Sequence, residues 1–551
     1  MRRAPAFRLL ACAAIAASFA CHPSVAAADP NGVPVCTAAG DQLRPVTVSD
    51  AQGGAVVVWH DERPGSPAGG LCYAQRVNAA GAPVWTLDGV ALCTTGDVND
   101  PVAVGDGGGG AYVAFGGQGS APRLQWINSA GVPQWGADGL TLSSATTAAR
   151  ELTIARDFGG GGDILVAWRQ DNAASSDIFG QKVSSTGVLQ WNPGGQALET
   201  LTDNETLPAI VSDGAGGAVL AWVTSAGGVR AMGFKSNGVG AWSRTPLSTT
   251  ANNMGLSIVP DGTGGAIIGW GGGGSYAQRV SSLGTKEWNP TSTGVLLSSG
   301  GNMTNLLGDG TGGATAVWQD FRSTTNYNVY VQRLRNDGVQ LWGTNGAAVC
   351  TATQDQNLPQ IVSDGSNGSI ITWFDYRFSN ATGADIYAQH LDATSAAQWI
   401  ADGIPLCAAT GAQEYPTIAT DGAGGAFVAW QDHRSGTNYD IYLQRVSPAG
   451  STLAVPGSDG TTARLEAWPN PFSDRVQLDF ALPSPARVRE TVVDVAGRTV
   501  RDLGSVALAG GAHQLRWDGR THAGRPADAG IYFLRVTAPG LELSRRVIRL
   551  K

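Results

Sequence analysis

This chain contains little charge and few of the side chains that commonly build metal sites or catalytic centres. Only 15% of its 551 residues are charged, and histidine occurs 6 times. The histidines and cysteines show no spacing typical of a zinc site, and neither a GxSxG nucleophile motif nor a phosphate-binding loop occurs. We therefore expect no metal and no cofactor, and no catalytic residues can be assigned by motif.

Long apolar runs are confined to the N-terminus. Three arginines precede an apolar stretch from Leu9 to Ala20, and small residues at 26–28 follow it. This pattern predicts a secretory signal peptide at residues 1–28. Lipidation at Cys21 is an alternative, but the three residues before it match a lipoprotein site poorly. Because no other run approaches the ~20 apolar residues of a membrane span, we expect an exported protein, extracellular or on the outer cell surface, without a transmembrane span.

Cationic residues are scarce in the larger part of the chain. From Asp29 to Ala463 there are 19 Lys+Arg and 35 Asp+Glu, a net charge of −16, whereas Arg464 to Lys551 carries 14 and 9, a net charge of +5. Nucleic-acid binding requires clustered cations. The acidic region therefore excludes nucleic acid as an expected partner.

What the chain has in abundance is glycine and regularly spaced tryptophan. Fourteen of the 17 tryptophans fall into two series that repeat every 48 to 57 residues, which indicates a repeat architecture. The first series, which includes one phenylalanine, is Trp59, Phe115, Trp168, Trp222, Trp270, Trp318, Trp373 and Trp430. The second is Trp85, Trp135, Trp191, Trp242, Trp288, Trp342 and Trp399.

Each repeat predicts four short strands, as Glu414–Gly450 illustrates. They are a PxIV run, a GGAxVAW run, a DIYxQRV run and a segment around the second tryptophan and the following DGxxLC. Asp-Gly-x-Gly-Gly, which suits a tight turn, joins the first two. The strands are almost continuously apolar, so both faces of each sheet are expected to be covered. Stacked four-stranded blades of a β-propeller satisfy this requirement.

The two ends of the repeat region predict a closed ring. The last repeat stops near Ala454 without its DGxxLC segment, and Asp29–Cys36 aligns with that segment of the preceding repeat, 401–407. One blade would then be built from both ends, and closure would remove the exposed strand edges of an open array. The sequence predicts an all-β, eight-bladed propeller over residues 29–455. Seven blades and an open solenoid remain alternatives.

Five cysteines follow the predicted signal peptide: Cys36, Cys72, Cys93, Cys350 and Cys407. An exported protein can form disulfides, but the count is odd. Four of the five end the same predicted strand, and equivalent positions in neighbouring repeats are usually too far apart to be bridged. We expect buried small side chains, and the sequence leaves their pairing open.

A polar linker at 456–464 precedes a segment of different composition, residues 465–551. The alternation in VQLDFAL and IYFLRV predicts a small β-sandwich. The segment contains the motifs PNPF, DVAGR, WDGR and GIYF, with Pro469, Asn470, Pro471, Phe472, Gly497, Arg498, Trp517, Gly519, Gly530 and Tyr532. It resembles the FlgD-type Ig-like module and the type A sorting domain of type IX-secreted bacterial proteins. The resemblance implies passage through the type IX secretion machinery and then removal or surface attachment of the domain. A structural spacer is the alternative.

One recurring pattern exceeds the needs of the fold. Repeats 1, 6, 7 and 8, neighbours in a closed ring, follow the first tryptophan with Asp-x-Arg, and the same arc carries long loops with aromatic residues. Aromatic rings beside Asp and Arg suit sugar or peptide recognition. The candidate binding arc is Asp61, Arg63, Asp320, Arg322, Asp375, Tyr376, Arg377, Asp432, His433 and Arg434, with the loop residues Phe321, Tyr327, Phe378 and Tyr439. The alternative is a local salt bridge that caps a hairpin and was copied with the repeat.

These features favour an exported, non-catalytic protein that binds a glycan or a protein ligand. One alternative is an enzyme that acts on extracellular polysaccharide, because glycosidases need two carboxylates about 5–10 Å apart, which Asp375 and Asp432 could supply. A passive surface scaffold is the other.

Overall fold

The structure is a computed structural model in which all regular elements of the described residues are strands. It describes residues 31–452, 466–468, 472–482, 486–495, 497–508, 511–538 and 541–550, with gaps in the first range at 68, 97, 118–119, 145–147, 158, 160, 173–174, 201–202, 226, 250–253, 291–292 and 380–382. The predicted signal peptide and linker lie outside these residues. Two compact units, one spanning Ala28–Val455 and the other containing Pro456–Lys551, make up the described chain. The all-β prediction is confirmed.

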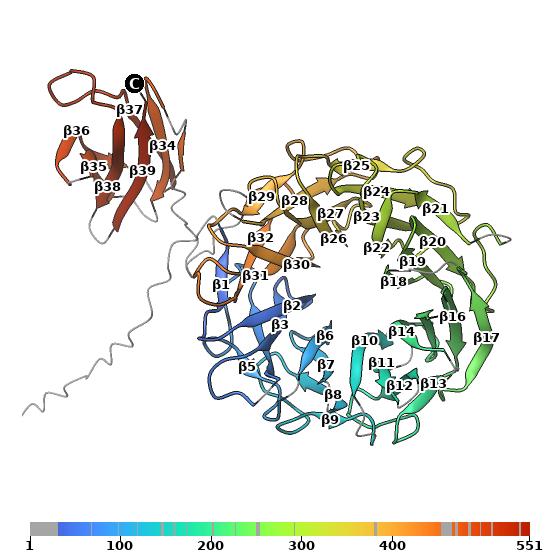
Figure 1. Cartoon of the computed structure of the whole chain (residues 1–551). Coiled ribbons are helices and arrows are strands. Elements are labelled where there is room, and N and C mark those ends of the chain that lie inside the picture. Colours follow the sequence, from blue (N-terminus) through green and yellow to red (C-terminus); the bar gives the residue numbers. More distant parts are fainter. Residues whose placement is uncertain are drawn as a thin grey trace, which may run out of the picture. The chain divides into compact units, whose positions relative to one another are not determined.

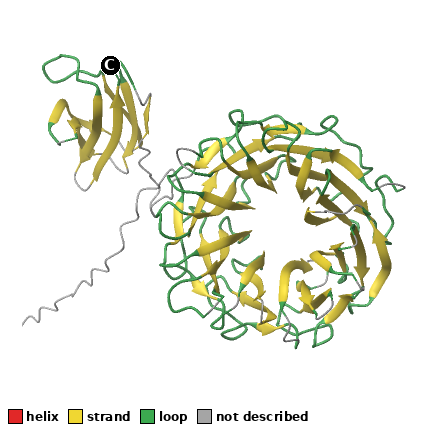
Figure 2. Ribbon diagram, viewed as in Figure 1, coloured by secondary structure: helices red, strands yellow, loops and turns green. Residues whose placement is uncertain are grey.

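The first unit contains eight four-stranded antiparallel sheets arranged as a ring around a central axis (Figures 1 and 2). We number the sheets 1 to 8 by their repeats. Each begins with an inner strand that lies nearest the axis (Figure 1). The inner strands are β2 (Gln42–Ser49), β6 (Asn99–Gly105), β10 (Ala149–Asp157), β14 (Glu205–Ser212), β18 (Met254–Pro260), β22 (Gly301–Gly308), β26 (Gln356–Ser363) and β30 (Gln413–Thr420).

From the inner strand the chain runs outward through two central strands to an outer strand. The second strands, buried along most of their length, are β3 (Ala55–Asp61), β7 (Ala111–Gly117), β11 (Asp163–Asp171), β15 (Ala218–Thr224), β19 (Ala266–Gly271), β23 (Ala314–Asp320), β27 (Ser369–Asp375) and β31 (Ala426–Asp432). The third strands are β4 (Leu71–Val77), β8 (Ser120–Ile127), β12 (Ser176–Val183), β16 (Val229–Phe234), β20 (Ser275–Val280), β24 (Asn328–Leu334), β28 (Asp385–Leu391) and β32 (Asp440–Val446). The outer strands are β5 (Val90–Ala91), β9 (Leu140–Thr141), β13 (Gln196–Glu199), β17 (Gly240–Pro246), β21 (Val295–Ser298), β25 (Ala347–Cys350), β29 (Ile404–Cys407) and β1 (Val33–Cys36).

Sheet 8 combines both ends of the ring, as the alignment of the termini predicts. The outer strand β1 pairs with β32, with Val33 opposite Leu443, so that the sheet order is β1-β32-β31-β30 (Figure 1). Its inner strand lies beside β2 of sheet 1, where the hydroxyl oxygens of Thr47 and Thr417 are 2.7 Å apart. The ring is therefore closed, and no inner strand is left at an open end.

The first tryptophan series lies inside the sheets. All of its members are buried, with exposed fractions of 0–2%. Gly32, which precedes the outer strand β1, packs against the indole of Trp430. Its φ is +91°, and a Cβ at this position would lie 2.5 Å from the indole. Gly32, which follows Asn31 in this segment, thus combines a left-handed turn with close packing on an indole, which only glycine allows.

The second series joins each sheet to the next. The indole of Trp399 in sheet 7 donates a 2.9 Å hydrogen bond to the carbonyl of Pro448 in sheet 8, and its backbone amide bonds the side chain of Gln389. In sheet 7 the outer strand begins after this tryptophan, at Ile404, whereas we expected it to include the tryptophan. In sheet 4 the outer strand β17 does include its tryptophan, Trp242.

The second unit is a β-sandwich of two sheets, β33-β34-β37 and β36-β35-β38-β39. Its strands are β33 (Glu466–Trp468), β34 (Val476–Leu482), β35 (Ala486–Asp494), β36 (Thr499–Leu508), β37 (Gly511–Trp517), β38 (Gly530–Ala538) and β39 (Leu541–Arg549). Trp517 is fully buried in its core between Phe472 and Tyr532, with ring centroids 5.5 and 5.0 Å away.

Candidate functional site

The ring has two faces with different loops. We call the face that carries the Asp-Gly turns between first and second strands the turn face. The loop face carries the connections from second to third strands, where the Asp-x-Arg pairs occur. Since neighbouring strands are antiparallel, the inner strands begin at the loop face.

The aspartates of the Asp-x-Arg pairs are buried beneath the loop face rather than presented on it. Asp432, which is 0% exposed, accepts a 2.8 Å hydrogen bond from the indole of Trp430 and a 2.6 Å bond from Arg434. The guanidinium stacks on Tyr442, 3.7 Å from the ring centroid. The same geometry recurs at Asp61/Arg63, Asp320/Arg322 and Asp375/Arg377, with stacking on Tyr73, Tyr330 and Tyr387. We call each such group a clamp.

Each clamp also ties its loop to two outer strands. Arg434 donates to the carbonyl of Asn31, just before β1 of its own sheet, and to the sulfur of Cys407 in sheet 7. Burial raises the pKa of Asp320, the equivalent aspartate in sheet 6. Hydrogen bonds from Arg322, Ser298 and Trp318 together lower this pKa by more than burial raises it, so the net shift is downward. In sheet 6 the ion pair with Arg322 therefore favours the ionised form of the Asp320 carboxyl.

The sheets without a clamp show what the aspartate supplies. In sheets 3, 4 and 5 the indole nitrogens of Trp168, Trp222 and Trp270 are buried and have no hydrogen-bond partner among the described residues. Sheet 2 has Phe115 at this position, which has no N–H to satisfy. The aspartates thus complete the hydrogen bonding of a buried tryptophan, which matches the hairpin-capping alternative for the Asp-x-Arg pattern.

Exposed groups on the arc are aromatic. Phe321 and Phe378 are 42% and 56% exposed, respectively. Phe321 packs against Tyr327 at 5.0 Å between ring centroids, and His433 packs against Tyr439 at 4.8 Å. The loops of sheets 6, 7 and 8 therefore place rings on the loop face above the clamps.

A feature that sequence reasoning missed lies at the start of the inner strands. All eight strands show the same interruption of register, two residues in from their loop-face end, so that each has a β-bulge. At the bulge Arg44, Glu151, Leu207, Leu358 and Tyr415 have φ between 48° and 52°, and Gly255 has φ of 65°. The signal in the sequence was the residue before the first-strand proline, which varies between repeats. Without the register, it could not be distinguished from ordinary variation.

Several of these bulges line a cavity of about 360 Å³ at the loop-face end of β2, β6, β26 and β30. Its wall includes Arg44, Asp100, Leu358, Gln360 and Tyr415. Arg44 and Asp100 form an ion pair across sheets 1 and 2, and Tyr415 is 44% exposed. We call this place the mouth. It is a concave surface with polar groups and an aromatic ring, the usual composition of a small-ligand site.

The Tyr415 ring connects the mouth with the arc. Phe374 lies between them, with ring centroids 6.2 Å from Tyr415 and 5.7 Å from Tyr376. The hydroxyl of Tyr439 donates to Glu414 at 3.3 Å. Residues of sheets 7 and 8 thus form one aromatic surface, which runs from the exposed loops to the mouth.

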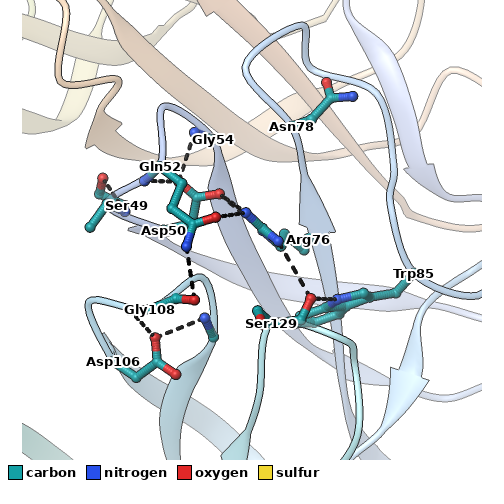
Figure 3. Close-up of polar contacts among 12 residues, drawn as sticks. Ser49, Asp50, Gln52, Gly54, Arg76, Asn78, Trp85, Asp106, Gly108 and Ser129 are labelled. Atoms are coloured by element: carbon teal, nitrogen blue, oxygen red, sulfur yellow. Dashed lines mark hydrogen bonds and ion pairs between the residues drawn. The ribbon is translucent and has the colours of Figure 1, made fainter.

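The turn face has polar contacts of a different kind. Asp50 accepts hydrogen bonds from the amides of Gln52 and Gly54 and forms an ion pair with Arg76, while the Gln52 side chain reaches the carbonyl of Gly108 in sheet 2 (Figure 3). Trp85 and Arg76 both bond the carbonyl of Ser129 (Figure 3). These groups are occupied with each other, so this face holds sheets together.

The five cysteines are buried and free, as buried small side chains would be. Burial raises the pKa of Cys36, Cys350 and Cys407 to about 12. The amide of Cys72 donates to the sulfur of Cys93 at 3.3 Å. The thiols are therefore poor nucleophiles at neutral pH. Among the described residues no group of three or more His, Cys, Asp or Glu side chains could hold a metal ion.

The sandwich motif residues serve as core and turns. Phe472, Trp517 and Tyr532 are core residues, Gly497 and Gly519 have φ of 76° and 69°, and Gly530 begins β38. Arg498 is exposed and pairs with Asp494 at 2.7 Å. Pro469, Asn470 and Pro471 lie outside the described residues.

Comparison with known proteins identifies the sandwich. Residues 472–540 match the family model of the FlgD Ig-like domain. The resemblance predicted from the PNPF, WDGR and GIYF motifs is thus confirmed for this domain. No curated protein matches the chain.

Solved structures similar to this chain include the BP39L lectin of Burkholderia pseudomallei, with 13% identity, a TM-score of 0.44 and coverage of 66% of this chain and 99% of the lectin. They also include PorZ, a surface component of the type IX secretion system of Porphyromonas gingivalis. It has 12% identity and a TM-score of 0.23, and the match covers 94% of this chain and 82% of PorZ. A puromycin-hydrolysing peptidase of Mycobacterium tuberculosis is another, with 11% identity and a TM-score of 0.38. The match covers 82% of this chain and 61% of the peptidase. At these values the comparisons assign no ligand. No helix of the described residues is long and apolar enough to cross a membrane.

Proposed function

We propose that this protein is exported and binds an extracellular glycan, without catalysis, on the loop face of its ring. The observation that carries the proposal is the arrangement of the arc: the clamp aspartates are buried and each bonds an indole and an arginine, whereas aromatic rings are exposed at the surface. Aromatic side chains pack well against the apolar faces of sugar rings while neighbouring polar groups bond their hydroxyls.

The geometry favours binding over hydrolysis by the carboxylates named in the enzyme alternative. Asp375 and Asp432 are 0% exposed, and each already bonds an indole and a guanidinium. A glycosidase needs one carboxyl group that protonates the leaving oxygen and another that attacks the sugar or activates water. Neither aspartate can take such a role without dismantling its clamp.

A glycan array probed with the full chain after signal-peptide removal tests the proposal. We expect binding by the unchanged protein and weaker binding by Phe378→Ala and Phe321→Ala. Leu283→Ala is a matched control, because Leu283 is 81% exposed on sheet 5, outside the arc. Equal binding by all four proteins would place recognition elsewhere, and no binding by any of them would favour a protein ligand or a scaffold.

We further propose that the sandwich directs export through type IX secretion. The match of residues 472–540 to the FlgD Ig-like domain supports this assignment, as does the family resemblance of its motifs. A chain ending at Thr462 should keep a folded ring, measured by circular dichroism and thermal unfolding, and should accumulate in the cell envelope. Normal release of the truncated protein would contradict a sorting role and leave the spacer alternative.

A further inference from the structure

We infer that the bulges at the start of the inner strands form a second recognition element, and that the four of them that line the mouth take an uncharged oligosaccharide. The inference rests on the proposed function and deepens it, because it names the residues and the ligand chemistry. We call the described bulge residues the bulge ring: Arg44, Asp100, Glu151, Leu207, Gly255, Leu358 and Tyr415. Of these, Arg44, Asp100, Leu358 and Tyr415 line the mouth.

The backbone of the bulge ring is constant while its side chains are not. Non-glycine residues rarely adopt positive φ because it strains the backbone, yet five of the eight inner strands hold one there at the same register. The scaffold positions vary little: seven of the eight repeats have Trp in the first series, and all four clamps use Asp and Arg. At the bulge the side chains are cationic, anionic, aliphatic and aromatic. A fixed backbone with varied side chains is how repeat proteins build binding surfaces.

Neighbouring sheets fix the direction of the bulges. The amide of Arg44 donates to the side chain of Gln431 in sheet 8 at 3.1 Å, and the amide of Leu358 donates to Gln319 in sheet 6 at 3.0 Å. The amide of Leu207 donates to Glu151 in sheet 3 at 2.6 Å. Because these three bulges are bonded to the neighbouring sheet, their backbone is held in place before any ligand arrives, which reduces the entropic cost of binding.

The chemistry of the mouth suits a neutral, hydroxyl-rich ligand. The charge of Arg44 is balanced by Asp100 in an ion pair, so an anionic ligand would have to displace a carboxylate. Donors and acceptors remain on this pair and on the Gln360 amide. The Tyr415 ring and the pyrrolidine rings of Pro45, Pro101 and Pro416 line the same cavity and offer apolar surface for the C–H faces of a sugar. Its volume of about 360 Å³ falls in the range of small-ligand sites.

The test measures binding of neutral gluco-, manno- and galacto-oligosaccharides, with sialylated and sulfated glycans on the same array. The bulge variants are Tyr415→Ala, Tyr415→Phe and the charge-balanced double variant Arg44→Ala/Asp100→Ala. Phe378→Ala serves as the arc variant and Leu283→Ala as the surface control. Thermal unfolding of each protein shows whether the ring is intact.

We expect Tyr415→Ala and the double variant to lose at least ~10-fold in affinity for neutral oligosaccharides, equivalent to about 1.4 kcal/mol, with unchanged unfolding. Tyr415→Phe should retain most binding because it keeps the ring. Neutral glycan binding that all bulge variants retain would overturn this inference and leave the proposed function standing. Preference for sialylated or sulfated glycans would overturn the ligand class, and no glycan binding by the unchanged protein would overturn both proposals.

Discussion

Sheets 1, 6, 7 and 8 and sheets 3, 4 and 5 bury the same tryptophan in different ways. In sheet 7 the indole of Trp373 bonds Asp375 at 2.8 Å, whereas in sheet 4 the buried indole of Trp222 has no hydrogen-bond partner among the described residues. An unpaired buried donor costs about 1–3 kcal/mol. The closed ring tolerates this cost in three sheets, so the clamps must do more than satisfy an indole.

The difference follows the loops. Sheets 6, 7 and 8 carry long loops with aromatic residues, and there the clamp arginine bonds outer-strand groups such as Asn31 and Cys407. Sheets 4 and 5 have short, glycine-rich connections at this point. The comparison indicates that a clamp anchors the base of a long loop, and that the arc is a rigid part of the loop face.

The largest effect is expected from removing the segment around β1, because two clamps lose a contact at once. The segment around β1 supplies the Asn31 carbonyl to the clamp of sheet 8 and the Cys36 sulfur to that of sheet 1. A chain beginning at Thr37 should lose at least about 5 kcal/mol in free energy of unfolding relative to one beginning at Asp29, because the truncation removes both buried strand residues and clamp contacts. Equal melting temperatures for the two chains would mean that the ring does not need its N-terminal strand.

Removing one clamp carboxylate should cost less. Asp375→Ala leaves the Arg377 guanidinium and the Trp373 indole without their buried acceptor, and we expect a loss of about 3–5 kcal/mol in denaturant unfolding. Thr224→Ala is the matched control, since Thr224 occupies the equivalent position in sheet 4 and its buried hydroxyl bonds no residue in the described part of the chain. That variant should lose no more than about 1 kcal/mol. Similar losses would contradict the anchoring role.

The indole hydrogen bond can be isolated by changing the tryptophan itself. Trp373→Phe and Trp222→Phe remove similar apolar volume from the core, but only the first leaves an aspartate short of a donor. We expect Trp373→Phe to be the more destabilising by about 1–3 kcal/mol in denaturant unfolding. If Trp222→Phe were the worse of the two, its indole would have a partner that the structure does not contain.

The smallest effect concerns pH. Burial raises the pKa of Asp440 in sheet 8 to about 6, and sheet 6 has the neutral Asn328 at this position. Because the folded state binds this proton more tightly than the unfolded state, its contribution is full below pH ~4 and is lost as the pH rises through about 6. Asp440→Asn should therefore stabilise the protein at pH 7–8 and flatten its stability profile between pH 4 and 6. An unchanged profile of melting temperature against pH would show that Asp440 does not titrate in this range.

Much of the architecture could be predicted from individual residues. The spacing of Trp373 and Trp430 predicted the repeat, and the alignment of Asp29–Cys36 with the end of the preceding repeat predicted that β1 would complete sheet 8. The candidate site was harder to predict. Asp375 and Asp432 stood out because they recur, but recurrence could not distinguish a carboxylate that faces a ligand from one that faces a buried indole.

The sequence by itself determined which segments become strands, which strand closes the ring and which family the C-terminal domain resembles, because these depend on short-range patterns and their periodicity. Only the tertiary structure decided where the polar groups point. The Arg44 amide is fixed by Gln431, 387 residues away, and the mouth combines side chains of sheets 1, 2, 7 and 8. Such convergence depends on the curvature and closure of the ring, which bring together residues whose individual positions in the sequence carry no sign of one another.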